Sequence, residues 1–277
     1  MNKKLIGAIL LFLLGAAGAH AGDAAPANGS AAALKDLQSA AERGDAKAQF
    51  SLGVMYSQGH GVPRDMAAAR KWWLKAAEQG LVPAEYNLGL AYMRGEGGTT
   101  NDADAAKWLG KAAEKGDAEA ESSLAHLYRD GRGVAKDEKE AVRLWRKAAD
   151  QQNAEAQYNL GIAYRKGVGV AKDDAEALKW WRKAADQGDV EAQYNVGFSY
   201  LTGTGVSKDI TEAERWWRMA AEHGLARAQF AMGIMYLKGT GVSRDRPRRF
   251  NGFTRPRNRV TPWRNIWWAW RTPAETA

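Results

Sequence analysis

The chain has 277 residues, of which 45% are hydrophobic and 26% are charged, so it can bury a sizeable core. It contains no cysteine, which excludes disulfide bonds, thiolate metal ligands and a thiol nucleophile, and four histidines are too few for a histidine-rich metal centre. The net charge of +8 comes from the two ends: residues 246–277 hold eight arginines and one glutamate, residues 1–21 hold two lysines, and residues 22–245 carry a net charge of −1. Composition therefore gives no support for a nucleic-acid partner.

Residues 1–21 have the pattern of a secretory signal peptide. Lys3 and Lys4 precede an apolar run over residues 5–18, and Ala19-His20-Ala21 fits an A-x-A cleavage site. The apolar run is shorter than the roughly 20 residues that span a bilayer, so we expect cleavage after Ala21 and no transmembrane span in the mature protein. Residues 22–30 are expected to form a flexible linker. This pattern predicts a bacterial protein that is periplasmic or secreted.

A short motif recurs every 36 residues. Each copy is followed by a pair of glycines, then in most copies by a basic residue and an aspartate, as in Lys172-Asp173, and then by tryptophan and an alanine pair, as in Trp180-Trp181 and Ala184-Ala185. Self-similarity at this period is the signature of a stacked-repeat architecture. The tyrosines that close the motif are Tyr56, Tyr92, Tyr128, Tyr164, Tyr200 and Tyr236.

Two helices are predicted in each repeat. Over residues 154–166, Ala156, Leu160 and Ala163 share one helical face, and the glycines that follow end the helix. Asp173 can cap the second helix, predicted over residues 174–187. A single pair cannot bury its apolar stripe, so we expect residues 31–245 to stack into an α-solenoid. We predict a cap helix over 31–43, five full repeats over about 44–223, and a half repeat whose helix covers about 226–238.

The consensus AxAQYNLGxxYxxGxGVxKDxxEAxKWWRKAA resembles Sel-one-like repeats (SLR), a branch of the tetratricopeptide superfamily, over about residues 31–245. The resemblance implies an all-α fold, an α-solenoid of 36-residue helix-turn-helix repeats wound into a right-handed superhelix. It also implies a non-enzymatic exported scaffold that binds a protein or peptide partner in its concave groove. Some cysteine-rich bacterial relatives are linked to penicillin binding, so the alternative is a cell-wall-associated hydrolase or a penicillin- or glycan-binding relative.

The resemblance also implies which residues line the groove, because the first helix of each repeat faces it. Tyrosine beside asparagine would offer rings and amides to a peptide, and arginines would bind carboxylates. The alternative for Asn159 and Asn195 is a local structural hydrogen bond. The predicted groove residues are Tyr86, Asn87, Arg94, Ser122, His126, Arg129, Tyr158, Asn159, Arg165, Tyr194, Asn195 and Phe198.

No catalytic, cofactor or metal site is predicted. The histidines after the leader, His60, His126 and His223, lie in different repeats, and no G-x-S-x-G nucleophile motif is present. Tryptophans of the second helices are expected to pack between repeats. The alternative for these rings is a stacking platform for a sugar or cell-wall glycan.

The repeat pattern stops after Asp245. Pro247 and Pro256 are incompatible with the helix that the repeat requires. Permitted codons for residues 246–277, read two bases later, can spell a further repeat, and Trp267-Trp268 then forces the Val-Gly that the repeat expects. We hypothesise a one-base deletion near codon 246. An arginine- and tryptophan-rich membrane or anion binder and a solvated disordered extension are the alternatives.

The missing second helix has a predicted structural consequence. The helix over residues 226–238 is the first helix of the last repeat, and it would have no second helix to pack against. We therefore expect residues 226–238 to fray or to mediate self-association. The side chains expected to be partly unburied are Phe230, Met232, Ile234, Met235 and Leu237.

Overall fold

The computed structural model describes residues 27–238, which form twelve α-helices joined by turns. The predicted leader 1–21 and tail 246–277 lie outside the described residues. The helices are α2 (Ala27–Glu42), α3 (Ala46–Gln58), α4 (Met66–Glu78), α5 (Val82–Arg94), α6 (Asp102–Glu114), α7 (Ala118–Asp130), α8 (Glu138–Asp150), α9 (Ala154–Lys166), α10 (Asp174–Asp186), α11 (Val190–Thr202), α12 (Ile210–Glu222) and α13 (Ala226–Lys238).

Local sequence sets the ends of the helices. The Asp173 carboxylate accepts hydrogen bonds from the backbone N–H groups of Ala175 and Glu176, which caps α10 as predicted. Gly167 ends α9 with a φ of +69°, and its N–H donates to the carbonyl of Ala163. In the middle repeats the second glycine of the pair also leaves room for the backbone of the preceding repeat. A Cβ at Gly169 would lie 2.1 Å from the Glu138 carbonyl oxygen.

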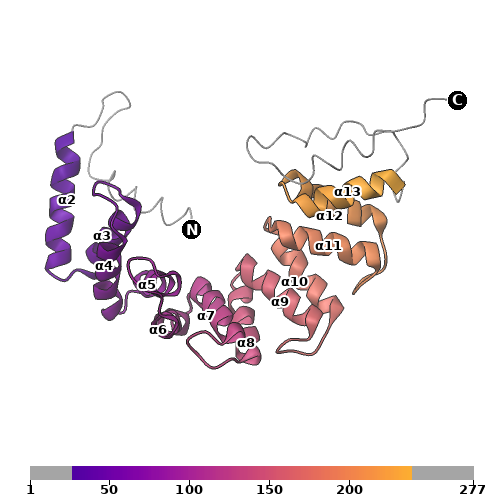
Figure 1. Cartoon of the computed structure of the whole chain (residues 1–277), viewed down its shortest axis with the longest axis horizontal. Coiled ribbons are helices and arrows are strands. Elements are labelled where there is room, and N and C mark those ends of the chain that lie inside the picture. Colours follow the sequence, from indigo (N-terminus) through magenta and orange to yellow (C-terminus); the bar gives the residue numbers. More distant parts are fainter. Residues whose placement is uncertain (1–26, 239–277) are drawn as a thin grey trace.

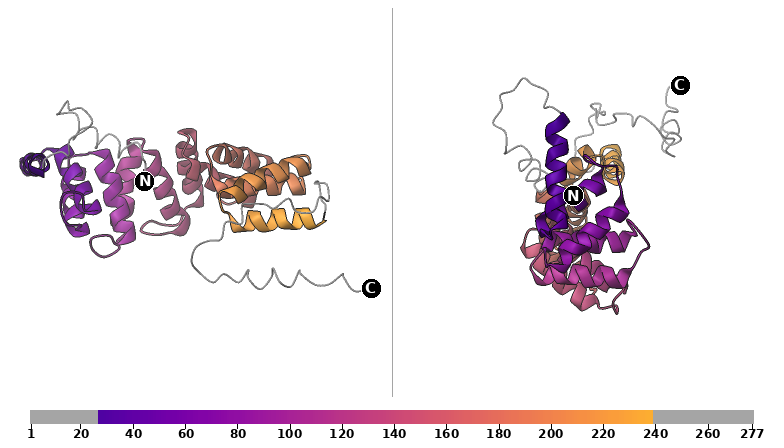
Figure 2. Two further views of the ribbon diagram at one scale, coloured as in Figure 1. Left: turned by 90° about the horizontal axis from the view of Figure 1, so that it is seen from above. Right: turned by 90° about the vertical axis from the view of Figure 1, so that its left-hand side faces the viewer.

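Successive helix pairs stack into one arc. Each helix packs against the helix before and the helix after it in the chain, and α2 and α13 lie at the two ends of the arc (Figure 1). Seen from above, the pairs form a single elongated row (Figure 2). Around the middle of the arc, α5 and α7 lie toward its inside and α6 and α8 toward its outside (Figure 1). The predicted all-α solenoid of paired helices is confirmed.

Small residues allow the two helices of a repeat to approach closely. A Cβ at Gly161 would lie 2.4 Å from Trp181 Cδ1, and Gly197 meets Trp217 in the same way. The tryptophans therefore insert over glycine, and their indoles form much of the core between repeats.

A buried polar residue recurs at each junction between repeats. Gln157 Nε2 donates to the Ala149 carbonyl at 3.1 Å, and Gln187 Nε2 donates to Gln157 Oε1 at 2.8 Å, so this side chain links α8, α9 and the end of α10. Gln49, Glu85, Glu121 and Gln193 occupy the same register and are also buried. The two bonds of Gln157 satisfy both ends of its buried amide.

The first helix starts earlier than predicted. α2 begins at Ala27, inside the segment 22–30 that we expected to be a linker, and ends at Glu42. Leu34, Leu37 and Ala41 pack against Leu52 of α3, so the predicted cap helix covers the start of the array. Helix formation is cooperative, and the packed turns of α2 extend toward the N-terminus through residues 27–30.

The last helix is better covered than predicted. Met232 and Met235 are 2% and 4% exposed, because both pack against Trp217 and Ala220 of α12. The expectation of partial exposure was therefore wrong for the two methionines. Ile234 is half-buried, Phe230 is 55% exposed, and the side chain of Leu237 lies outside the described part. Among the helices that the structure describes, none combines the length and the apolar character that crossing a bilayer requires.

Candidate binding surface

The predicted groove residues lie on helices α5, α7, α9 and α11, each the first helix of its repeat. Tyr86, Tyr158 and Tyr194 occupy one register position, and each is half-buried. Ser122 holds this position in α7, but it is 1% exposed, so its prediction as a groove-lining residue was wrong. Its small side chain ends within the packed helix pair instead of reaching the surface.

At the far end of this surface, an arginine and two aromatic rings form one stack. Tyr194 lies 5.7 Å from Trp217 with the ring planes 18° apart, and the Arg227 guanidinium lies 4.3 Å above the Tyr194 ring. Arg227 also forms an ion pair with Glu191 of α11. Phe198, one turn after Tyr194 on the same helix face, is 41% exposed. This cluster presents an exposed apolar ring beside an immobilised tyrosine.

In the centre of the surface, a histidine joins two repeats. His126 Nε2 lies 3.0 Å from Glu155 Oε1, and the His126 ring meets Trp145 edge-on at 5.4 Å. The hydrogen bond from His126 holds the pKa of Glu155 below its ordinary value, against the raising effect of burial. Glu155 is 65% exposed at its side chain, so it remains open to a ligand.

The tyrosine of repeat two bonds across to repeat three. The Tyr86 hydroxyl shares a hydrogen bond with the side chain of Ser123. Burial, together with the charges of Glu119 and Asp117, raises the pKa of Tyr86. This tyrosine therefore stays neutral and is oriented by its neighbour.

The asparagines do not form a uniform row of ligand donors. Asn159 is 9% exposed, and its Nδ2 donates to the Glu155 carbonyl at 2.8 Å within α9. This is the local structural bond that we considered as the alternative. Asn87 and Asn195 are half-buried. Asn195 is the better placed of these to meet a partner, because Phe198 on the same helix is exposed.

The predicted arginines already have carboxylate partners. Arg129 bonds both oxygens of Asp130, at 2.7 and 2.9 Å, and Arg165 Nη1 lies 2.9 Å from Asp174 Oδ1. Arg94 lies 3.9 Å from Glu96, and it is one residue out of register with Arg129 and Arg165. The three therefore do not form one cationic row, and a ligand carboxylate would have to compete with these internal ion pairs.

Three contact residues were missed by the sequence reasoning. Glu155 and Glu191 bond to His126 and Arg227, and Ser123 bonds to Tyr86. Their signal was present, because Glu119, Glu155 and Glu191 are spaced by 36 residues. Arg227 replaces this glutamate in the last repeat, and only the structure shows that it reaches back to α11.

The tryptophans of the described second helices do not form a sugar-stacking platform. Trp72 is half-buried. The other seven in the described repeats are between 2% and 5% exposed. This matches the predicted packing between repeats and contradicts the alternative, since a sugar needs an accessible ring face. The seven are Trp73, Trp108, Trp145, Trp180, Trp181, Trp216 and Trp217.

The described residues contain no group of three or more histidine or acidic side chains arranged to hold a metal ion. His223 Nδ1 lies 2.8 Å from the Met219 carbonyl, whereas His126 faces Glu155, so the histidines have separate structural partners. The arrangement on the inner helices provides hydrogen bonds, half-buried rings and one exposed ring. These are the features of a recognition surface.

The stacked helix pairs with this surface define a helical-repeat scaffold protein. The Sel1 repeat family matches residues 46–81, 82–117, 118–153, 154–189, 190–225 and 226–248, and the chain belongs to this family. The protein is therefore a Sel1-repeat scaffold, and its last matched repeat is incomplete.

Solved structures support this assignment. The protein c5321, described as a protective antigen present in uropathogenic Escherichia coli strains with an SLR fold, is 36% identical with a TM-score of 0.74. The match covers 77% of this chain but 46% of that one, so the chain spans less than half the length of c5321. A Sel1 repeat protein from Oxalobacter formigenes is 28% identical, with a TM-score of 0.73 and full coverage of both chains. Comparison with curated proteins gives no significant match.

Proposed function

We propose that this protein is a non-enzymatic scaffold that binds a protein partner along its concave face. The observation that carries the proposal is the α11 cluster, where Phe198 is 41% exposed beside the Tyr194–Arg227 stack. Large exposed rings next to rigid aromatic side chains are typical of binding hot spots. The groove formed by stacked first helices offers a long, continuous surface for such a partner.

The surface chemistry suggests how a partner segment would be held. An apolar side chain would pack on Phe198, and a cationic or hydrogen-bonding group would reach Glu155 beside His126. Asn195 lies between these two anchors in the register of the repeats. We therefore propose a peptide-like ligand with alternating apolar and polar groups.

A crosslinked pull-down from cells tests the groove. Phe198→Ala and Tyr158→Ala should each lower partner recovery severalfold, since hot-spot truncations cost about 2 kcal/mol or more. Lys179→Ala is the matched control, because Lys179 lies on a second helix and pairs with Glu176 there. Equal recovery with all three variants and the wild type would count against the groove.

We further propose that the protein is exported to the periplasm or secreted. The support is the pattern of residues 1–21, where a basic start precedes an apolar run and an A-x-A site. N-terminal sequencing of the protein purified from its source should begin at Gly22. A mature protein that still begins at Met1 would overturn this part of the proposal.

A further inference from the structure

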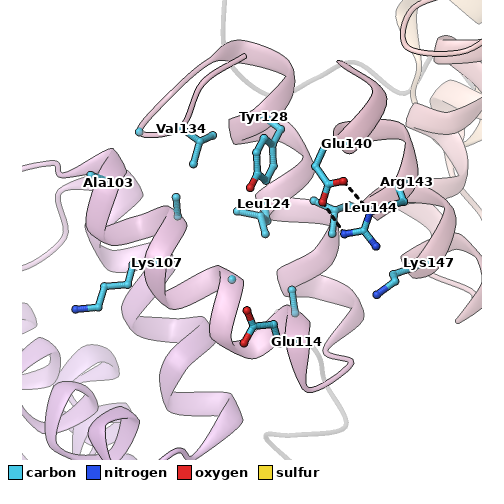
Figure 3. A pocket seen from close by; sticks show the side chains of 14 residues that line it. Ala103, Lys107, Glu114, Leu124, Tyr128, Val134, Glu140, Arg143, Leu144 and Lys147 are labelled. Atoms are coloured by element: carbon cyan, nitrogen blue, oxygen red, sulfur yellow. Dashed lines mark hydrogen bonds and ion pairs between the residues drawn. The ribbon is translucent and has the colours of Figure 1, made fainter. Parts of the chain in front are cut away.

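A cavity of about 380 Å³ opens between α6 and α8, away from the inner surface described above. Side chains of these two helices form its walls, and Leu124 and Tyr128 of α7 form its floor (Figure 3). The Tyr128 hydroxyl points into the space between the walls (Figure 3). The cavity lies at the seam where the second helices of repeats two and three meet.

Two departures from the repeat pattern create this cavity. Gly110 stands where the following repeats carry Arg146, Arg182 and Arg218, and a Cβ built at Gly110 would meet no atom within 4 Å. Leu144 stands where the other repeats carry a tryptophan, namely Trp72, Trp108, Trp180 and Trp216. Both shortened side chains line the same cavity.

The neighbouring seams show what the missing groups do. Arg146 donates to the Tyr164 hydroxyl, and Arg218 donates to the Tyr236 hydroxyl at 3.4 Å. Tyr128 is the equivalent of these tyrosines, and Gly110 supplies it with no guanidinium. On the other wall, Lys183 lies 3.9 Å above the Trp180 ring, whereas its equivalent Lys147 faces the shorter Leu144.

The side chains around the cavity carry more positive than negative charge, as do those at the next seam. Lys107, Arg143 and Lys147 line it together with Glu114 and Glu140, and Arg143 is held by Glu140. At the next seam the corresponding positions are Arg143, Lys179 and Lys183, and Arg146 is nevertheless seated there on Tyr164. A guanidinium at Tyr128 would therefore meet the same surroundings as one that the fold already accommodates.

We propose that this cavity binds an arginine side chain and an adjacent aromatic side chain of a partner protein. The guanidinium takes the place of Arg146 and Arg218 and donates to Tyr128. The aromatic ring takes the place of Trp180 and lies beneath Lys147. This site is on the outer helices, so it is separate from the groove of the proposed function and gives the scaffold a second point of attachment.

The test uses tyrosine rings labelled with carbon-13 in the full chain, with Tyr128→Phe to assign the Tyr128 signal. The probe is the dipeptide N-acetyl-Arg-Trp-amide. We expect a saturable shift of the Tyr128 signal, and roughly tenfold weaker binding of N-acetyl-citrulline-Trp-amide, since citrulline keeps the shape but loses the charge. N-acetyl-Arg-Ala-amide should also bind more weakly.

Two variants that fill the cavity complete the test. Gly110→Arg and Leu144→Trp restore the residues of the other repeats, so each should fold cooperatively and lose the dipeptide shift. If Gly110→Arg does not fold, Leu144→Trp carries the comparison. Absence of a saturable Tyr128 shift, equal binding of the citrulline peptide, or retention of the shift in a folded filled variant would each overturn the proposal.

Discussion

Glycines inside the helices serve different purposes at different register positions. Gly161 receives the Trp181 indole, which leaves no room for a methyl group, whereas nothing lies within 4 Å of a Cβ at Gly110. Both residues are helical, so both lower the helix propensity by a similar amount. Any difference between alanine substitutions at the two sites therefore reports packing.

We predict opposite effects for these substitutions. Gly161→Ala should destabilise the protein by about 1–3 kcal/mol, because the new methyl group displaces the indole. Gly110→Ala should stabilise it by about 0.5–1 kcal/mol, because alanine favours the helix and meets no neighbour. Urea unfolding measures both. A stabilising Gly161→Ala would contradict the close packing of α9 and α10.

Glu121, one of the buried polar residues at the junctions between repeats, is a carboxyl group that glutamine should replace with a gain in stability. Glu121 is 2% exposed, and burial raises its pKa above the ordinary 4.5. Gln157, at the same position in the next repeat, donates to the carbonyl eight residues earlier. A glutamate can make that bond only while it is protonated, so the folded chain holds this proton to higher pH than the unfolded chain.

Glu121→Gln should therefore stabilise the protein by about 1 kcal/mol at pH 7. The gain should shrink as the pH falls through the raised pKa toward 4.5, because the wild-type carboxyl group is then neutral as well. Unfolding curves at several pH values measure this, with exposed Glu119→Gln as the control. A gain that is independent of pH would show that Glu121 is not the titrating group.

Sequence alone predicted residue positions well in the core and less well on the groove. Ala156, Leu160 and Ala163 are buried as the helical periodicity indicated, because burial follows from register. The partners of Asn159 and Arg129 could not be predicted, because they depend on side-chain rotamers and on single neighbouring residues such as Asp130. Surface contacts of this kind vary from repeat to repeat even when the backbone does not.

At the scale of elements, the helix boundaries follow the capping residues. The predicted helix over 154–166 coincides with α9, and the one over 174–187 differs from α10 by one residue. α2 is the exception, because it runs through Gly29, a residue that we expected to belong to a linker. The residues that cap helix ends are local signals in the sequence. The start of the terminal helix α2 depends on packing instead.

Within the described residues, α13 differs from the other first helices in packing against one neighbouring helix instead of two. It packs on α12, and within the described residues no atom lies within 4 Å of a Cβ at Gly233, where Gly161 and Gly197 meet tryptophans. The buried Met232 and Met235 hold its inner face. Because one face of α13 is packed, its local opening costs less free energy than the opening of an internal helix.

Amide hydrogen exchange should therefore be faster in α13 than in α9, by an order of magnitude or more if local opening costs about 1.4 kcal/mol less. α9 is the matched comparison, because it has the same length and the same place in its repeat. Equal protection of residues 226–238 and 154–166 would show that the last helix is covered as fully as an internal one.

At the scale of the whole molecule, the array ends within a repeat. The last family match covers residues 226–248, whereas each earlier match covers a full 36 residues. Among the described residues nothing lies within 4 Å of a Cβ at Gly233, the position where Gly161 and Gly197 meet the tryptophan of their second helix. Both observations agree with the hypothesis of a one-base deletion near codon 246, which stays a prediction.

Resequencing the genomic DNA over the codons for Asp245 to Phe250 tests that hypothesis. We expect one base to be missing relative to other isolates. The restored chain should then melt at a higher temperature, because a completed repeat adds an interface to α13. A continuous reading frame through residue 277 in every isolate would contradict it, and the arginine- and tryptophan-rich tail would then be genuine.

Site-specific photocrosslinking tests most directly whether the first helices of the repeats hold a protein partner. A benzophenone amino acid would replace Phe198 on the first helix α11 and, in a matched variant, Lys179 on a second helix. We expect a discrete adduct of one partner from position 198 that Tyr194→Ala weakens, and no such adduct from position 179. Adducts of equal yield from both positions, or from position 179 alone, would contradict the account.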